Sequence, residues 1–314
     1  MKKMRIPLII ALCIPVIGLI LGSFFDLQIS QAIASPTSTL GLIISVIGPT
    51  IGFAAVAACG GGFIAFALKG DYPKWLKVIF FILAACCLGV SIYYPGGEYF
   101  GVNGFYGAAP KIIGYLIVIV PEGAAMFGGY VLFKDNQNKN MWIVFCAMIV
   151  MLCIALLAVI PIIKDNMHRP RFRFLNRVDN YELFHNWWQP CKNYKELIEQ
   201  YQGLYGSLSE IKENFKSFPS GHTAEASIFM VPVVFLPLAN KKFEKYQLPL
   251  FFFGLCWTIL VGFGRILAAA HFLSDISMGA LITITLLFIT NEVLMRIKAV
   301  QLEEPAPVEE AKAE

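Results

Sequence analysis

Long apolar segments dominate this sequence of 314 residues and restrict what it can fold into. About eight of them reach the roughly 20 mainly apolar residues that a helix needs to cross a bilayer. In lipid the backbone has to satisfy its own hydrogen bonds, and an α-helix does so. The sequence therefore predicts an all-α integral membrane protein, with about eight transmembrane helices and a helical core bundle that carries the functional site. The predicted spans are residues 5–24, 40–68, 76–94, 111–133, 141–163, 220–238, 247–267 and 271–297.

The composition supports a membrane protein over the alternative, a soluble all-α protein. Hydrophobic residues make up 57% of the chain and charged residues 15%, against about 25% charged residues in soluble domains. The chain starts with Met-Lys-Lys-Met-Arg and an apolar run, a pattern shared with signal peptides. That run is long for a signal peptide and no Ala-x-Ala site follows, so we expect an uncleaved first span.

The basic residues predict how the chain is oriented in the membrane. The net charge is +4, and short basic segments flank alternate ends of the predicted spans. With eight spans these segments share one side, which the positive-inside rule makes cytoplasmic. The opposite loops, 26–38 and 95–110, contain no Lys or Arg. The basic residues on the predicted cytoplasmic side are Lys2, Lys3, Arg5, Lys69, Lys74, Lys77, Lys134, Lys139, Lys241, Lys242, Lys245, Arg296 and Lys298.

Three domain-like regions are expected along the chain. Residues 1–140 hold about four N-terminal spans, and residues 141–298 form a transmembrane core interrupted by an extracytoplasmic insertion at 174–218. Helical periodicity in the insertion predicts amphipathic helices, which either lie in the membrane interface or cap the protein. Residues 299–314 are rich in Glu, Pro and Ala, which predicts a disordered cytoplasmic tail. Seven of the eight cysteines lie in spans, so we expect packing residues rather than disulfides.

Two stretches after the fifth predicted span carry groups that bind anions. Lys164 and Arg171 stand in Lys-Asp-Asn-Met-His-Arg-Pro-Arg, on the outer side, where basic residues are unusual and lipid headgroups are one alternative partner. In Pro-Ser-Gly-His, Ser220 is a natural helix N-cap, and the free N–H groups of Ser220 and Gly221 suit an anion. His222 then lies in the first turn. An ordinary capped helix with an interfacial histidine remains the alternative.

The third stretch pairs a histidine with a carboxylate. His271 and Asp275 are four residues apart and share a helix face. A carboxylate there can hold the proton of one ring nitrogen and leave the other nitrogen nucleophilic, although a purely structural pair is equally compatible with this spacing. Arg265 precedes a turn and can fold back to bind phosphate oxygens. The predicted spans bring all three stretches to the same outer membrane face.

In this order, Lys-x6-Arg, Pro-Ser-Gly-His and Arg-x5-His-x3-Asp resemble the motifs of the type 2 phosphatidic acid phosphatase superfamily. The resemblance implies that His271 attacks phosphorus to form a phosphohistidine, that Asp275 orients it, and that His222 protonates the leaving oxygen and later activates water. It also implies that the phosphoryl oxygens are bound by Lys164, Arg171, Arg265, Ser220 and Gly221. We see no metal-ligand spacing, and the resemblance implies a metal-independent reaction without a cofactor.

The chain departs from that family at two positions. Phe172 stands where the family usually has Pro, and Gly264 stands where it usually has Ser. The missing hydroxyl removes one phosphate donor, for which the Gly264 N–H is a possible substitute. Glu225, three residues after His222, is expected either to tune that histidine or to pair with a basic residue of the site.

These observations predict a phosphatase of the cell membrane that hydrolyses a lipid phosphate or diphosphate at the extracytoplasmic face. Undecaprenyl diphosphate and phosphatidic acid are examples of such substrates, and nucleic acid is not an expected partner. A lipid phosphotransferase that uses the same intermediate is the first alternative. A transporter is another, favoured by the span count and by Glu122 within the fourth span. A catalytically inactive lipid sensor is the third, which the intact histidines disfavour.

Overall fold

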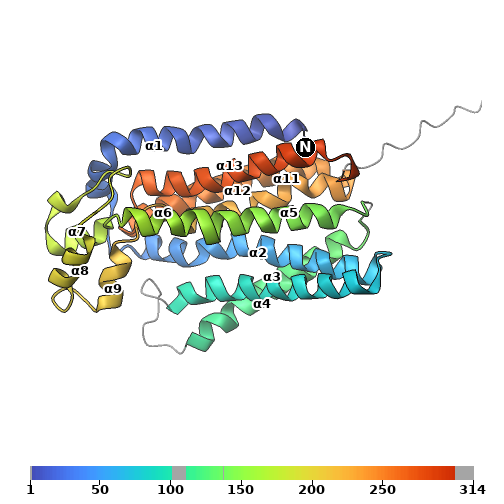
Figure 1. Cartoon of the computed structure of the whole chain (residues 1–314), viewed down its shortest axis with the longest axis horizontal. Coiled ribbons are helices and arrows are strands. Elements are labelled where there is room, and N and C mark those ends of the chain that lie inside the picture. The colour runs from blue at the N-terminus through green and yellow to red at the C-terminus, as the bar shows by residue number, and fades with distance from the viewer. Residues whose placement is uncertain (1, 101–110, 137, 301–314) are drawn as a thin grey trace, which may run out of the picture.

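The computed structural model describes residues 2–100, 111–136 and 138–300, and they form an all-helical bundle (Figure 1). In this part of the chain, seven helical segments are long and apolar enough to cross a membrane, and a shorter apolar segment, Val118–Phe133, belongs to the fourth predicted span. The predicted fold class, an all-α membrane protein with about eight spans, is therefore confirmed. The main helices are α1 (Arg5–Ile33), α2 (Thr39–Lys69), α3 (Lys74–Phe100), α4 (Lys111–Phe133), α5 (Met141–Cys153), α6 (Ile160–Met167), α10 (Gly221–Ser227), α11 (Met230–Ala239), α12 (Glu244–Leu267) and α13 (Leu273–Arg296).

The long helices lie side by side along one axis (Figure 1). α1 packs along α13, while α2 packs against both α3 and α4 and also contacts α10 and α12. α5 and α6 are joined by the π-helical residues Ile154–Val159, so the fifth span continues without a break. The sixth span is formed by α10 and α11 together.

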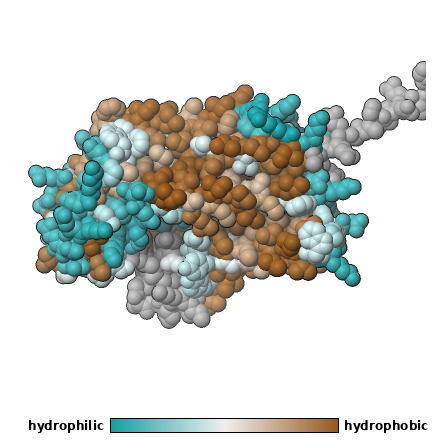
Figure 2. Space-filling model, viewed as in Figure 1, coloured by the Kyte–Doolittle hydropathy of each residue, from teal (hydrophilic) through white to brown (hydrophobic). Residues whose placement is uncertain are grey.

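The surface of the bundle is apolar around its middle and hydrophilic at both ends (Figure 2). Large aliphatic and aromatic side chains are exposed there, among them Phe24, Val120 and Ile162. Such an apolar belt between polar ends fits a hydrocarbon layer. Asn138, which follows α4, joins two other segments of the chain. Its side chain donates hydrogen bonds to the carbonyls of Leu238 and Val300, at 3.1 and 2.7 Å.

The predicted insertion packs on the protein as a cap, one of the two arrangements that its sequence left open. It contains α7 (Phe172–Val178), α8 (Tyr194–Tyr201) and α9 (Leu208–Asn214), gathered at one end of the bundle (Figure 1). Its buried side chains, such as Phe174 and Ile211, form a cluster with Phe272 from the α12–α13 connection. The Trp187 indole N–H also donates to the Ser23 hydroxyl of α1, at 3.0 Å.

The first helix is longer than predicted. Hydropathy placed its end near residue 24, but α1 continues to Ile33. The polar residues that lower the hydropathy there, Asp26 and Ser30, are buried within the protein instead of facing water. The predicted loop 26–38 is therefore reduced to the few residues between α1 and α2. Most of the predicted loop 95–110 and nearly all of the predicted tail lie outside the described residues.

Candidate active site

The sequence-predicted residues lie at or beside three helix connections, α6–α7, α9–α10 and α12–α13, near the cap. Lys164 lies near the end of α6, Arg171 just before α7, and His222 in the first turn of α10. Arg265 lies in the last turn of α12, and His271 in the short connection to α13. The Ser220 N–H donates to the Asp275 carbonyl at 2.9 Å, which joins the starts of α10 and α13.

A backbone carbonyl fixes the tautomer of His271. Its Nδ1 lies 2.7 Å from the carbonyl oxygen of Ser217. A carbonyl oxygen can only accept a hydrogen bond, so Nδ1 carries the proton in this arrangement. The lone pair of the neutral imidazole is then on Nε2. The ring is 1% exposed, so this orientation is held inside the protein.

The surroundings of His271 favour its neutral imidazole. Burial lowers the pKa of His271 well below its ordinary value, because the charged form loses its hydration. The nearby Asp275 carboxylate opposes this effect, whereas the positive charges of Arg171 and Arg265 lower the pKa further. A neutral imidazole with a free Nε2 is the form that can attack an electrophile.

Asp275 orients this histidine indirectly. The predicted hydrogen bond between the two side chains is not formed, since Asp275 Oδ2 lies 3.6 Å from His271 Nδ1. That oxygen instead accepts from the Ser217 hydroxyl at 2.5 Å and from the Phe272 N–H at 2.8 Å. Asp275 thus positions Ser217, whose carbonyl positions His271. The sequence analysis missed Ser217 because its contribution to the histidine is a backbone group.

A buried ion-pair network holds Asp275 in turn. Arg169 donates to Asp275 Oδ1 and to Asp26 Oδ2, the latter at 2.8 Å, and its side chain is closed to solvent. Its guanidinium carbon also lies 4.3 Å from the ring centroid of Phe272. Asp26 further accepts from the N–H of Ser274 at 2.9 Å. Asp26 was not predicted as a site residue, because the predicted first span ended at residue 24 and placed this carboxylate in a loop.

Two arginines place positive charge around His271 and Lys164. The charges of Arg171 and Arg265 act on both His271 and Lys164. We call Lys164, Arg171 and Arg265 the cationic cluster. Arg171 also lies 3.9 Å from Glu213 of the cap. Burial alone would raise the pKa of Glu213, but the hydrogen bond from Lys216 and the charge of Arg171 hold it below its ordinary value. Such a cluster of cations suits a phosphoryl group with several negative oxygens.

The Pro-Ser-Gly-His stretch begins α10 as predicted, with Ser220 as its N-cap. The Ser220 N–H is not available to an anion, however, because it donates to the Asp275 carbonyl. The Ser220 hydroxyl accepts from the Thr223 N–H, so it is turned toward its own helix. Gly221 faces the cations: an added Cβ there would lie 3.6 Å from Lys164 Nζ and 3.7 Å from Glu225 Oε1. Glu225 therefore lies on the Lys164 side of the site.

The two departures from the family pattern have packing reasons. Phe172 is buried in the cap, with its ring 6.0 Å from Tyr181 and 6.2 Å from Phe272 between centroids. Gly264 faces α2, where an added Cβ would lie 2.4 Å from Ile44 Cγ2. Its N–H is inside α12, whose own hydrogen bonds use it, so it cannot replace the missing hydroxyl as a phosphate donor.

A polar cavity of about 540 Å³ opens beside Arg265. Arg173 and Arg177 of α7 line it, together with Glu210 and Asn214 of α9 and the start of α2. It gives water or an anion a polar approach to the cationic cluster. Among the described residues, no group of three or more His, Cys, Asp or Glu side chains could hold a metal ion.

Comparison with protein families matches residues 140–298 to the PAP2 superfamily, about half of the chain. The chain belongs to the PAP2 superfamily. Comparisons with curated proteins and with solved structures found no match. The PAP2 match spans α5 to α13 and all three motif stretches, while α1–α4 lie before it. Asp26, which pairs with Arg169 of the matched region, is thus contributed from outside that region.

We expect the buried ion pairs of Arg169 to be required for stability. Arg169→Gln leaves two buried carboxylates without their cation, which should cost about 3–5 kcal/mol of folding free energy. The midpoint of thermal unfolding in detergent measures this loss. Arg5→Gln is the control, because Arg5 makes a comparable pair with Glu292 at the exposed end of the bundle and should change the midpoint far less. Equal midpoints for both variants would contradict the assigned role.

The packing of Gly264 predicts that restoring the family hydroxyl is harmful here. Gly264→Ser should cost about 1–3 kcal/mol, since the new side chain overlaps Ile44. Removing the overlap with Ile44→Ala in the same chain should recover part of this loss. Gly89→Ser is the control, because nothing lies within 4 Å of a Cβ at that position. The midpoints of thermal unfolding of the wild type, Gly264→Ser, Gly264→Ser with Ile44→Ala, and Gly89→Ser measure these differences.

Proposed function

We propose that this PAP2 protein is a membrane phosphatase that hydrolyses a lipid phosphate or diphosphate through a phosphohistidine at His271. The observation that carries the proposal is the 2.7 Å contact between His271 Nδ1 and the Ser217 carbonyl. It leaves the Nε2 lone pair as the nucleophile, on a ring that feels the charges of Arg171 and Arg265, and both arginines also act on Lys164. Phosphoryl transfer needs mainly such positioning and charge neutralisation.

The first chemical step is attack by His271 Nε2 on phosphorus. The lone pair forms the P–N bond while the bond between phosphorus and the leaving oxygen breaks. His222 gives a proton to that oxygen, so the product leaves as a neutral hydroxyl or a protonated phosphate. The cations bind the equatorial oxygens, on which negative charge accumulates in the transition state.

The second step releases phosphate. His222, now neutral, takes a proton from a water molecule whose oxygen attacks phosphorus. The electrons of the P–N bond return to Nε2, which restores His271. Gly221 gives the phosphoryl group room between α10 and Lys164, where a side chain would otherwise project.

A lipid substrate is supported by the place of the site in the bundle. The cationic cluster lies at the capped end of the bundle, where α6 and α12 end. The surface of the bundle is hydrophilic at its ends and apolar between them (Figure 2). A lipid phosphate can therefore present its headgroup to the cluster while its hydrocarbon part stays in the membrane. The distribution of Lys and Arg supports an extracytoplasmic position for this end. Residues 141–298 then act as the catalytic core, and α1–α4 as the N-terminal membrane domain.

Transfer of the phosphoryl group to an acceptor other than water uses the same intermediate. The polar cavity beside Arg265 is large enough for a small acceptor as well as for water. Product analysis with labelled lipid separates the two reactions, because only hydrolysis releases the label as free phosphate.

The purified protein should release phosphate from at least one member of a lipid panel that contains polyprenyl diphosphate, phosphatidic acid and phosphatidylglycerophosphate. Activity should persist in EDTA, since cationic side chains supply the charge neutralisation. His271→Ala should lower the rate by more than about 1,000-fold, because it removes the nucleophile. His185→Ala, in the cap, is the matched histidine control and should retain activity. Full activity of His271→Ala would refute the mechanism.

The pH dependence should report the charges around His271. In a profile of kcat/KM, the acid limb caused by protonation of the nucleophile should lie well below pH 6.5, because the pKa of His271 is lowered. Removing one positive charge with Arg171→Gln should raise that pKa and move the limb to higher pH. An acid limb that stays in place, whatever happens to the rate, would contradict this electrostatic account.

A further inference from the structure

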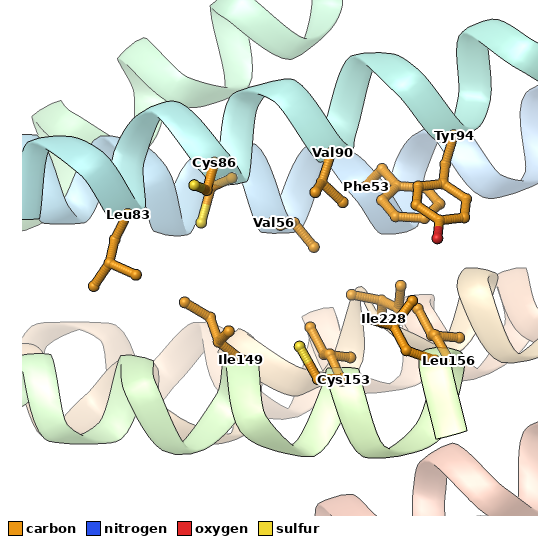
Figure 3. A pocket seen from close by; sticks show the side chains of 13 residues that line it. Phe53, Val56, Leu83, Cys86, Val90, Tyr94, Ile149, Cys153, Leu156 and Ile228 are labelled. Carbon is orange, nitrogen blue, oxygen red and sulfur yellow. The ribbon is translucent and has the colours of Figure 1, made fainter. Parts of the chain in front are cut away.

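An apolar groove lies between the N-terminal helices and the catalytic core (Figure 3). Its volume is about 250 Å³. Side chains of α3, such as Cys86 and Val90, face side chains of the fifth span, such as Cys153 and Leu156 (Figure 3). Phe53 of α2 and Ile228, just after α10, complete the lining. One wall therefore belongs to the PAP2 match and the other precedes it.

The groove leads toward the cationic cluster. At its end nearer the site, Tyr94 stacks on Phe53 with 5.4 Å between ring centroids, and the charge of Glu225 reaches Tyr94. α2 and α10 touch at this point, since an added Cβ at Gly52 would lie 2.0 Å from the Glu225 carbonyl oxygen. The Glu225 carboxylate lies beside Gly221 on the Lys164 side. Glu225 thus connects the Tyr94 end of the groove with the Lys164 side of the site.

The fifth span also connects the groove with Lys164. Leu157 lines the groove and Lys164 lies seven residues later on the same continuous helical segment. Seven residues correspond to about 10 Å of helix rise. A ligand whose phosphate is bound at Lys164 can therefore extend into the groove through a linker of a few bonds.

We propose that this groove binds one hydrocarbon chain of the substrate, so that the ligand is a lipid with a phosphate head at Lys164 and an apolar chain between α3 and α5. This inference rests on the proposed function and adds the place of the tail. A cavity of 150 Å³ accepts a benzene ring, so the groove takes about ten carbon atoms of one chain. It does not take both chains of a diacyl lipid.

The groove positions the substrate more than it adds affinity. A chain that moves from the bilayer into the groove leaves one apolar surrounding for another, so little hydrophobic free energy is gained. A chain fixed beside the site does restrict the headgroup, and restricted orientation accelerates the chemical step. Obstruction of the groove should consequently slow reaction of long-chain substrates and spare substrates too short to enter it.

The test compares hexadecyl phosphate, which reaches the groove, with butyl phosphate, which does not. Cys153→Trp and Cys86→Trp fill the groove from opposite walls, and both side chains are exposed, so the larger ring can be accommodated without unfolding. Each should lower kcat/KM for hexadecyl phosphate about tenfold while that for butyl phosphate stays within about twofold of the wild type. Cys256→Trp is the control, because Cys256 is exposed on α12 and does not line the groove.

The possible results distinguish failure of the groove proposal from failure of the proposed phosphatase function. If the wild type cleaves neither ester, the proposed function fails. If it cleaves both, and the two groove variants keep the wild-type ratio between the esters, the groove proposal is overturned while the phosphatase stands. A variant that loses both activities is misfolded, and the variant of the opposite wall then decides.

Discussion

Arg169 carries a full positive charge at a position closed to solvent, and such a charge is stable only when carboxylates neutralise it. Asp26 from α1 and Asp275 from α13 do so, which fixes the ends of two helices against the connection after α6. Asp275 can then orient Ser217, and the Ser217 carbonyl sets the proton of His271. The proposed nucleophile, His271, thus depends on a chain of contacts that begins with ion pairs from the connection after α6 to α1 and α13.

The fold and the motif residues could be predicted because their signals are local. Apolar runs of sufficient length indicate spans whatever their partners, and the motifs that contain Lys164, Arg171 and His271 suggest the roles proposed for them. Asp26 could not be interpreted in this way. Hydropathy treats a carboxylate as the end of a span, whereas here Arg169 neutralises it inside the protein. The family match also starts after α1, so it gives no indication of this pair.

Ser217 and Ser220 show a second limit of sequence reasoning. The carbonyl of Ser217 determines which nitrogen of His271 is free, but every residue has a carbonyl, so no side-chain pattern marks this one. The Ser220 N–H was expected to bind an anion because it begins a helix. The structure directs it to the Asp275 carbonyl instead, since α13 starts beside it. Both contacts depend on tertiary packing, which motif spacing does not encode.

The position of the phosphoryl group on the enzyme tests the central claim most directly. His222→Ala should slow hydrolysis of the intermediate, and an alkaline quench during turnover of labelled lipid phosphate preserves phosphohistidine. Because Nδ1 is occupied by the Ser217 carbonyl, we predict phosphohistidine at His271 with the label on Nε2, identified by peptide mapping and comparison with the two phosphohistidine isomers. Label on Nδ1 of His271, or on a different residue, would contradict the account.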